Sequence, residues 1–196
     1  MQCIAGPRPK RVGFVQVGWN RSRFWLWRKN IIRRIRRQLI SNMTPAIDAL
    51  RAASVKFDVR AYTHDPNSRS YGLEAAEKLG LPPRQVFKSL VVELEGGGLC
   101  MGIIPVSQQL NLKRLAKSAG AKRATMAPAK TVERATGYVM GGVSPFGLKR
   151  TVRAFIDTSA TNYNSVFVSG GKRGLDLEIS PHDLLVVTNG CLADLT

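Results

Sequence analysis

The stretch VFKSLVVELEGGGLCMGIIPV, residues 86–106, decides the fold that we expect for this chain. Two apolar runs, 86–94 and 99–106, flank a glycine-rich segment, and this pattern predicts two antiparallel strands joined by a hairpin. Lys88 stands inside the first run, and the two-residue period of a strand places it on one face with Val86 and Leu90. A lysine on an apolar face either reaches water at the end of its stem or serves a function that offsets the cost of burying it. Both interpretations remain open on these residues alone.

Working outward from the hairpin, helix and strand signals alternate irregularly along residues 43–196. Thr44 and Pro45 suit the start of a helix, and Gly80 and Gly120 suit helix ends. We expect helices over 44–54, 70–79, 111–119, 128–136 and 181–187, and further strands over 57–62, 122–126, 151–156, 165–169 and 174–179. Strands outnumber helices and several are joined by hairpins. This favours an α/β domain with α+β character, in which helices surround a mixed, curved sheet.

The charge of the chain divides it into two regions. Residues 1–42 hold 11 Lys or Arg and no Asp or Glu, whereas residues 43–196 hold 19 basic and 13 acidic residues. We expect 1–42 to be a basic extension that is disordered or lies upstream of the true start at Met43; a basic amphipathic helix over 28–40 is the alternative. Residues 43–196 suit one domain, and no stretch of the chain is long and apolar enough to predict a membrane span.

Several common chemistries have no support in the sequence. The three cysteines, Cys3, Cys100 and Cys191, lie far apart, so neither a zinc site nor a disulfide framework is expected, and a reducing cytoplasmic setting fits. His64 is one of two histidines and is interpreted as structural, with a catalytic base as the alternative. No nucleophile elbow, phosphate-binding loop or dinucleotide fingerprint is present. We therefore expect no metal and no cofactor.

Two glycine pairs are candidates for contact with a ligand. Gly141-Gly142 and Gly170-Gly171 would let the main chain approach a bound group closely and offer N–H donors to an anion. By sequence alone, ordinary turns are the favoured explanation of both pairs. By strand alternation alone, Asp176 is opposite to its apolar neighbours and is expected on a solvated face.

Residues 43–196 resemble the YbaK/EbsC-type bacterial Cys-tRNA(Pro) deacylases, which are relatives of the editing domain of prolyl-tRNA synthetase. Several motifs in the same order carry the resemblance: MTPA (43–46), YTHDP (62–66), QVFKSL (85–90), LKRLAK (112–117), TGYVMGGVSPFGLKR (136–150) and VSGGKRGLDLE (168–178). The resemblance implies a barrel-like sheet with helices around it. It also implies removal of cysteine wrongly attached to tRNA(Pro), with tRNA(Cys) as a further substrate.

The same resemblance implies which residues form the site. Lys88 maps onto the residue required for activity, and Tyr62, Tyr71, Gly141, Ser169 and Asp176 map onto other pocket positions; Gly142 and Gly170 accompany them in the glycine pairs. In this family the cysteine thiol of the substrate is thought to attack its own ester, which would explain why the chain offers no conventional nucleophile. Mischarged tRNA(Pro) is the expected partner, and a transient complex with prolyl-tRNA synthetase is plausible by resemblance.

Two other functions remain open. A sibling deacylase acting on another small amino acid, such as alanine on tRNA(Pro), would need water as its nucleophile. A non-catalytic tRNA-binding module would rely on the basic extension and on a cluster of basic residues, Lys113, Arg114, Lys117, Lys122 and Arg123. Neither the oligomeric state nor the preferred amino acid follows from the sequence.

Overall fold

The computed structural model describes residues 43–68 and 70–196. The expectation for residues 1–42 therefore lies outside the described residues. In the described part, five α-helices and one 3-10 helix accompany eight strands. The helices are α2 (Pro45–Ala52), α3 (Tyr71–Leu79), α4 (Leu112–Ala119), α5 (Ala129–Thr136), α6 (Pro181–Thr188) and the 3-10 helix η1 (Thr158–Asn162). The strands are β1 (Phe57–Ala61), β2 (Val86–Leu94), β3 (Leu99–Pro105), β4 (Ala124–Met126), β5 (Arg153–Asp157), β6 (Val166–Lys172), β7 (Leu175–Ile179) and β8 (Cys191–Ala193).

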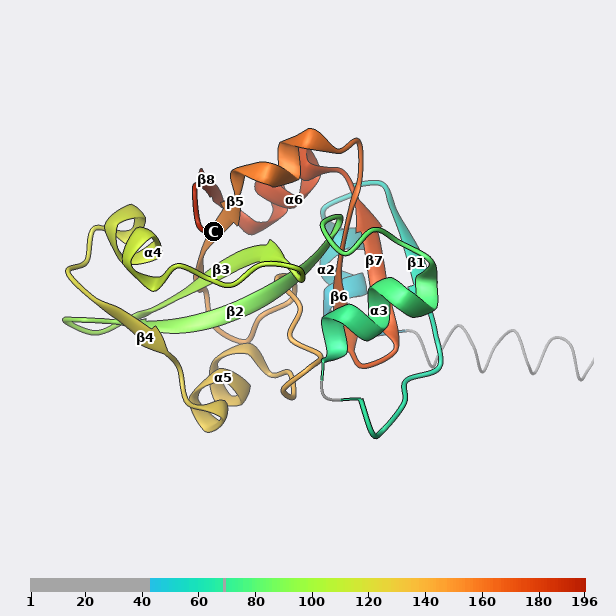
Figure 1. Cartoon of the computed structure of the whole chain (residues 1–196), viewed down its shortest axis with the longest axis horizontal. Coiled ribbons are helices and arrows are strands. Elements are labelled where there is room, and N and C mark those ends of the chain that lie inside the picture. Colours follow the sequence, from blue (N-terminus) through green and yellow to red (C-terminus); the bar gives the residue numbers. More distant parts are fainter. Residues whose placement is uncertain (1–42, 69) are drawn as a thin grey trace, which may run out of the picture. The chain divides into compact units, whose positions relative to one another are not determined.

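All eight strands belong to one mixed sheet, which confirms the expected fold class. The strands follow the order β1-β7-β6-β2-β3-β5-β8, and β4 pairs with β2 beside this path. The β2–β3, β6–β7 and β1–β7 pairs are antiparallel, whereas β2–β6, β3–β5 and β5–β8 are parallel. Figure 1 shows that the long strands β2 and β3 run between β4 and the part of the sheet formed by β6, β7 and β1, with helices on either side.

Local signals in the sequence set most element boundaries. Thr44 caps α2 by accepting a hydrogen bond from the Ile47 N–H at 3.3 Å, and Pro45 opens the helix. Asn111 caps α4 in the same way, and Gly80 and Gly120 end α3 and α4 with φ values of 66° and 75°. Each expected element is present with small shifts at its ends. The sequence did not predict η1 or the three-residue strand β8, which is held by pairing with β5.

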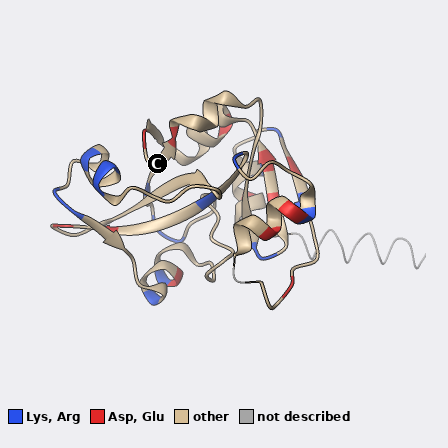
Figure 2. Cartoon of the chain, in the orientation of Figure 1, with Lys and Arg blue, Asp and Glu red and all other residues tan. Residues whose placement is uncertain are grey.

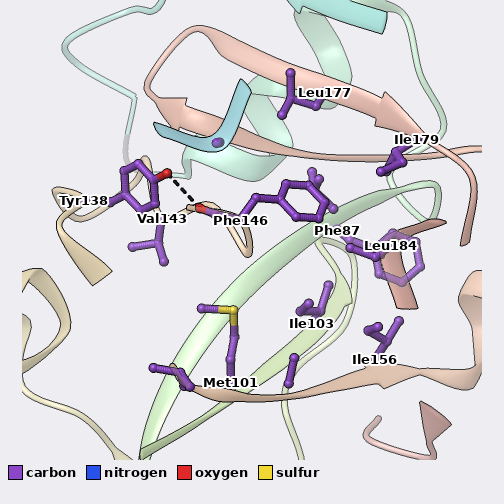
Figure 3. Packing of buried hydrophobic residues seen from close by; sticks show 14 of the residues in the cluster. Phe87, Met101, Ile103, Tyr138, Val143, Phe146, Ile156, Leu177, Ile179 and Leu184 are labelled. Carbon is purple, nitrogen blue, oxygen red and sulfur yellow. Dashed lines mark hydrogen bonds between the residues drawn. The ribbon is translucent and has the colours of Figure 1, made fainter. Parts of the chain in front are cut away.

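The main hydrophobic core lies between α2, the sheet and the segment that follows α5. Phe87, Met101, Ile103, Ile156 and Leu177 pack in it from four strands (Figure 3). The hydroxyl of Tyr138 donates a 2.8 Å hydrogen bond to the carbonyl of Phe146, so the polar end of this buried ring is satisfied. This packing fixes the chain just before Gly141, which borders the candidate site.

The β2 strand changes partners along its length, and this change creates an opening in the sheet. Along one edge β2 pairs with β3 throughout; along the other it pairs with β6 only at Val86 and Phe87, and with β4 from Val92 onward. Among the described strands, none pairs with residues 88–91 on that edge. None of the helices in residues 43–68 and 70–196 has the length and apolar character needed to cross a bilayer.

Candidate functional site

Lys88 lies at the opening in the sheet, immediately after the last residue paired with β6. Its side chain is partly buried, and its ammonium group donates a 3.3 Å hydrogen bond to the carbonyl of Val106. Loss of solvent lowers the pKa of Lys88. Within the described residues no carboxylate lies within ion-pair distance of it. The positive charge is thus held in place by the strand but is not neutralised, and it remains available to a negatively charged group.

A cavity of about 260 Å³ opens beside Lys88. It gathers most of the residues that the sequence singled out from four separate segments of the chain: Tyr62, Tyr71, Lys88, Gly141, Ser169 and Asp176. The apolar side chains of Ala75, Val86 and Val143 line the same cavity. A concave, largely apolar pocket with a few convergent polar groups is the usual form of a small-molecule site. None of the described residues that line the cavity is a cysteine or a histidine.

Asp176 differs most from its expectation. The interpretation as a residue on a solvated face is wrong, because the side chain is only 6% exposed. Strand β7 is covered on both faces and flanked by β1 and β6, so the alternation of side chains does not separate a solvent-exposed face from a buried face. Burial raises the pKa of Asp176 to about 7. Its Oδ2 atom has no hydrogen-bond partner among the described residues. A buried carboxyl oxygen without a partner is costly, which makes Asp176 a candidate for contact with a ligand donor.

Ser89 is a pocket residue that sequence reasoning missed. Its Oγ atom is buried and has no hydrogen-bond partner, a property that it shares, among the described residues, only with Asp176. Both residues line the same cavity. Alternation assigns Lys88 and Ser89 to opposite faces of β2, but both reach the pocket because it lies at the open edge of that strand. The signal in the sequence was a hydroxyl residue inside an apolar strand, next to the lysine.

The glycine pairs divide between the pocket and the scaffold. Gly141 lines the pocket with φ +84°, and a Cβ atom there would lie 2.5 Å from the Tyr71 ring. Gly142 lies outside the lining, and its N–H donates to the Val139 carbonyl at 3.0 Å. Gly170 also lies outside the lining, and its carbonyl accepts a 2.6 Å hydrogen bond from Thr44. A Cβ atom would lie 3.0 Å from Lys172 at Gly142 and 3.0 Å from Leu175 at Gly170, so close packing accounts for these two glycines. Of the two pairs, Gly141 alone is among the described residues that line the pocket.

The two tyrosines have different surroundings. Burial, and to a lesser degree the nearby Asp176 carboxyl, raises the pKa of Tyr62 to about 12, so its hydroxyl keeps its proton. Tyr71 begins α3, and its ring lies against the guanidinium of Arg173, 4.5 Å from the ring centroid. Each tyrosine thus supplies the pocket with an aromatic wall, and Tyr62 adds a hydroxyl group that keeps its proton.

His64 is close to the pocket but is not part of its lining. Its Nδ1 lies 2.8 Å from a carboxylate oxygen of the buried Glu74, whose other oxygen accepts a 2.6 Å hydrogen bond from the Asp65 N–H. These contacts fasten the segment after β1 to α3 and agree with a structural role for His64. The described residues contain no group of three or more His, Cys, Asp or Glu side chains that could hold a metal ion.

Comparison with known proteins connects this geometry to a family. Residues 65–186 match the aminoacyl-tRNA editing domain. The chain is 40% identical over 121 residues to EbsC of Enterococcus faecalis, provisionally described as a Cys-tRNA(Pro)/Cys-tRNA(Cys) deacylase; the match spans 62% of this chain and 74% of EbsC. It is 29% identical over 103 residues to the Escherichia coli protein ProXp-y, a multifunctional Ser/Thr-tRNA deacylase, over 51% of this chain and 60% of that protein.

A solved structure shares the fold. It is provisionally described as a trans-editing enzyme for prolyl tRNA synthetase, and it superposes with a TM-score of 0.67 at 26% identity. The similarity covers 78% of this chain and 94% of that one. The similarity therefore extends over nearly all of that solved chain.

Proposed function

The chain belongs to the aminoacyl-tRNA editing domain family, and on that premise we propose that it removes mischarged cysteine from tRNA(Pro). The single observation that carries the proposal is the pocket itself. Among the described residues, it combines an unneutralised lysine with two buried polar atoms that have no hydrogen-bond partner, and its lining holds neither cysteine nor histidine. Such a site can hold and polarise an aminoacyl ester without supplying a strong nucleophile. Cysteine on tRNA(Cys), which the description of EbsC includes, is a second substrate to test.

In the proposed reaction, the substrate supplies the attacking group. The cysteine sulfur bonds to the carbonyl carbon of its own ester, the bond from that carbon to the ribose oxygen breaks, and a cyclic thiolactone leaves. The thiol loses its proton and the ribose oxygen gains one, so the tRNA ends in a free hydroxyl. Lys88 stabilises the negative charge that develops on the carbonyl oxygen. Asp176 and Ser89 hold the amino group of the substrate, because each has a buried oxygen without a hydrogen-bond partner among the described residues.

Editing of this kind has a physical rationale. Small amino acids of similar size differ by about 1–3 kcal/mol in binding, which is too little for one synthetase pocket to separate them. A second site, which recognises a different chemical property of the amino acid, then removes the amino acids that were wrongly attached. We propose that the protein works in the cytoplasm, where charged tRNA is used, and that a transient complex with prolyl-tRNA synthetase delivers the tRNA.

Deacylation of cysteine-charged tRNA(Pro) by the full chain, with and without Lys88→Ala, tests the proposal. We expect Lys88→Ala to lower the single-turnover rate by about 100-fold or more, as removal of a donor to a developing oxyanion does elsewhere. Lys78→Ala, which removes an exposed lysine from α3, is the matched control and should leave the rate unchanged. Full activity of Lys88→Ala would contradict the assignment of the lysine.

The similarity to ProXp-y favours a second candidate, a deacylase for amino acids without a thiol. Such an enzyme would need water as the nucleophile. Alanine- and serine-charged tRNA in the same assay separate the two, because substrate-assisted attack through sulfur is impossible with either. If tRNA binds without turnover, and binding weakens steeply with salt, a non-catalytic tRNA-binding function replaces both deacylase functions. Figure 2 shows the basic residues on α4 and in the segment that follows it, which such binding would use.

A further inference from the structure

A tight turn carries Gly141 to the mouth of the pocket. The Gly142 N–H donates to the Val139 carbonyl at 3.0 Å, so residues 139–142 form a turn with Met140 and Gly141 at its centre. Gly141 has a φ of +84°, which is the conformation required at the third position of a type II turn. The orientation of the peptide between Met140 and Gly141 distinguishes this turn from a type I turn. Whatever holds that peptide determines which groups the turn presents to the pocket.

Arg173 holds this peptide from outside the pocket. Both Nε and Nη2 of its guanidinium donate to the Met140 carbonyl, at 3.2 and 2.9 Å. The guanidinium also lies against the ring of Tyr71, 4.5 Å from the ring centroid. Arg173 itself is exposed and does not line the cavity, whereas Met140, Gly141 and Tyr71 do. One side chain from the β6–β7 hairpin therefore joins the turn to the first residue of α3.

The geometry of a trans peptide gives this contact a consequence. The C=O and the N–H of one peptide point in opposite directions. Because Arg173 holds the Met140 carbonyl on the outer side, the Gly141 N–H is directed away from Arg173. Among the described residues no acceptor takes this N–H. Reversing the peptide would turn the carbonyl oxygen, an acceptor, to the side where the N–H donor now lies.

We propose that Arg173 is a positioning residue that fixes the Met140–Gly141 peptide so that the Gly141 N–H donates to an oxygen of the aminoacyl ester. This inference rests on the proposed deacylase function. It adds a hydrogen-bond donor that differs from Lys88, because a backbone N–H carries no net charge and cannot change its protonation state. The conformation of the turn also explains why glycine suits position 141. A side chain there would be strained by the positive φ and would strike Tyr71.

The test compares Arg173→Lys and Arg173→Met with Arg51→Met, which removes an exposed arginine from α2. Lysine keeps the charge but cannot supply the two-pronged contact or the flat stacking surface of arginine. We expect both Arg173 variants to lower the saturating single-turnover rate on cysteine-charged tRNA(Pro) by about tenfold or more. The half-saturating tRNA concentration should change less than about twofold, and Arg51→Met should match the unaltered protein. Thermal unfolding of each variant checks that the fold is retained.

Two results would overturn the proposal. In the first, Arg173→Lys keeps the full rate, whereas Arg173→Met raises the half-saturating tRNA concentration. Arg173→Met also reduces the slope of the logarithm of the binding constant against the logarithm of the salt concentration by about 0.7. Arg173 would then contact a phosphate of the tRNA end. In the second, neither variant changes the rate.

A measurement without substrate separates this proposal from the proposed function. In protein labelled with ¹⁵N-glycine, the amide signals of Gly141 and Gly142 should move in both Arg173 variants and stay in place in Arg51→Met. Unchanged Gly141 and Gly142 signals in the Arg173 variants would overturn the proposal even if activity fell. If the unaltered protein deacylates no tRNA, the proposed function fails, and these signals alone decide whether Arg173 holds the turn.

Discussion

Asp157 and Asp176 are two aspartates at nearly equal depth, 2% and 6% exposed, yet their surroundings are opposite. Asp157, at the end of β5, accepts hydrogen bonds from the N–H and hydroxyl of Ser159, the N–H of Leu195 and the hydroxyl of Thr196. These contacts tie the end of the chain to the sheet. Asp176, the second residue of β7, has no partner for Oδ2 among the described residues, and burial raises its pKa to about 7. Depth is the same, but only one carboxylate is satisfied.

The difference separates scaffold from site. A buried polar group that is fully hydrogen-bonded stabilises one arrangement of the chain, whereas one that is left without partners weakens the fold. The β6–β7 end of the sheet carries this unsatisfied group next to Lys88 and Ser89, and the β5–β8 end carries a satisfied one. We therefore expect substitutions at the two aspartates to have effects on different properties.

The largest expected effect is on activity at Asp176. Asp176→Asn keeps the shape but removes the carboxylate, so we expect the single-turnover deacylation rate to fall by about 100-fold, or about 2.7 kcal/mol in activation free energy. The free energy of unfolding should stay the same or rise, because a desolvated carboxyl is replaced by a neutral amide. Asp58→Asn, an exposed position on β1, serves as the control. A variant that lost stability while retaining its rate per folded molecule would place Asp176 in the scaffold.

The next effect is on stability at Asp157. In Asp157→Asn one acceptor oxygen becomes an NH₂ group, which must face an N–H or hydroxyl donor at Ser159 or Leu195. We expect the free energy of unfolding to fall by about 2 kcal/mol, the usual cost of leaving buried groups unpaired. The deacylation rate per folded molecule should remain within about twofold of the unaltered protein. Urea unfolding and the rate assay on the same sample measure both quantities, and a specific loss of rate would break the comparison.

Expressed per pH unit, the smallest effect is the pH dependence of stability that Asp176 imposes. Its pKa is raised from 3.8 to about 7 in the folded state, so between these values the folded protein holds a proton that the unfolded chain has lost. The unfolded state then binds fewer protons, and stability falls as pH rises through this window, with a contribution on the order of 1 kcal/mol per pH unit. Urea unfolding at several pH values measures the slope.

Asp176→Asn should remove this contribution, and Asp157→Asn should leave it in place. Identical slopes in the unaltered protein and in Asp176→Asn would show that the carboxyl is not desolvated in solution.

The comparison also shows where sequence reasoning reaches its limit at the site. Lys88 could be singled out because a charge inside an apolar strand is visible in the sequence. Asp176 could not be placed by alternation, because β7 has apolar neighbours on both faces, and Ser89 was passed over as one polar residue in a strand. Resemblance to the family, rather than periodicity, brought Tyr62, Tyr71, Gly141, Ser169 and Asp176 together, and the structure places all five in one cavity.

The sequence by itself determined the elements and their ends. Caps such as Thr44 and Asn111, glycines at helix ends and the hairpin around residues 95–98 act over a few residues, so they can be recognised without knowledge of the rest of the chain. The short strand β8 escaped prediction for the converse reason. Three residues have little preference of their own, and only pairing with β5 holds them extended.

Only the tertiary structure decided the chemistry at the open edge of β2. The opening exists because β6 leaves this strand after Phe87 and β4 joins it at Val92, from positions far apart in the sequence. Burial, missing hydrogen-bond partners and the contact of Arg173 with the Met140 carbonyl all depend on which segments meet there. Free energies of desolvation and hydrogen bonding are set by the atoms surrounding a group, and a linear sequence does not specify those atoms until the chain has folded.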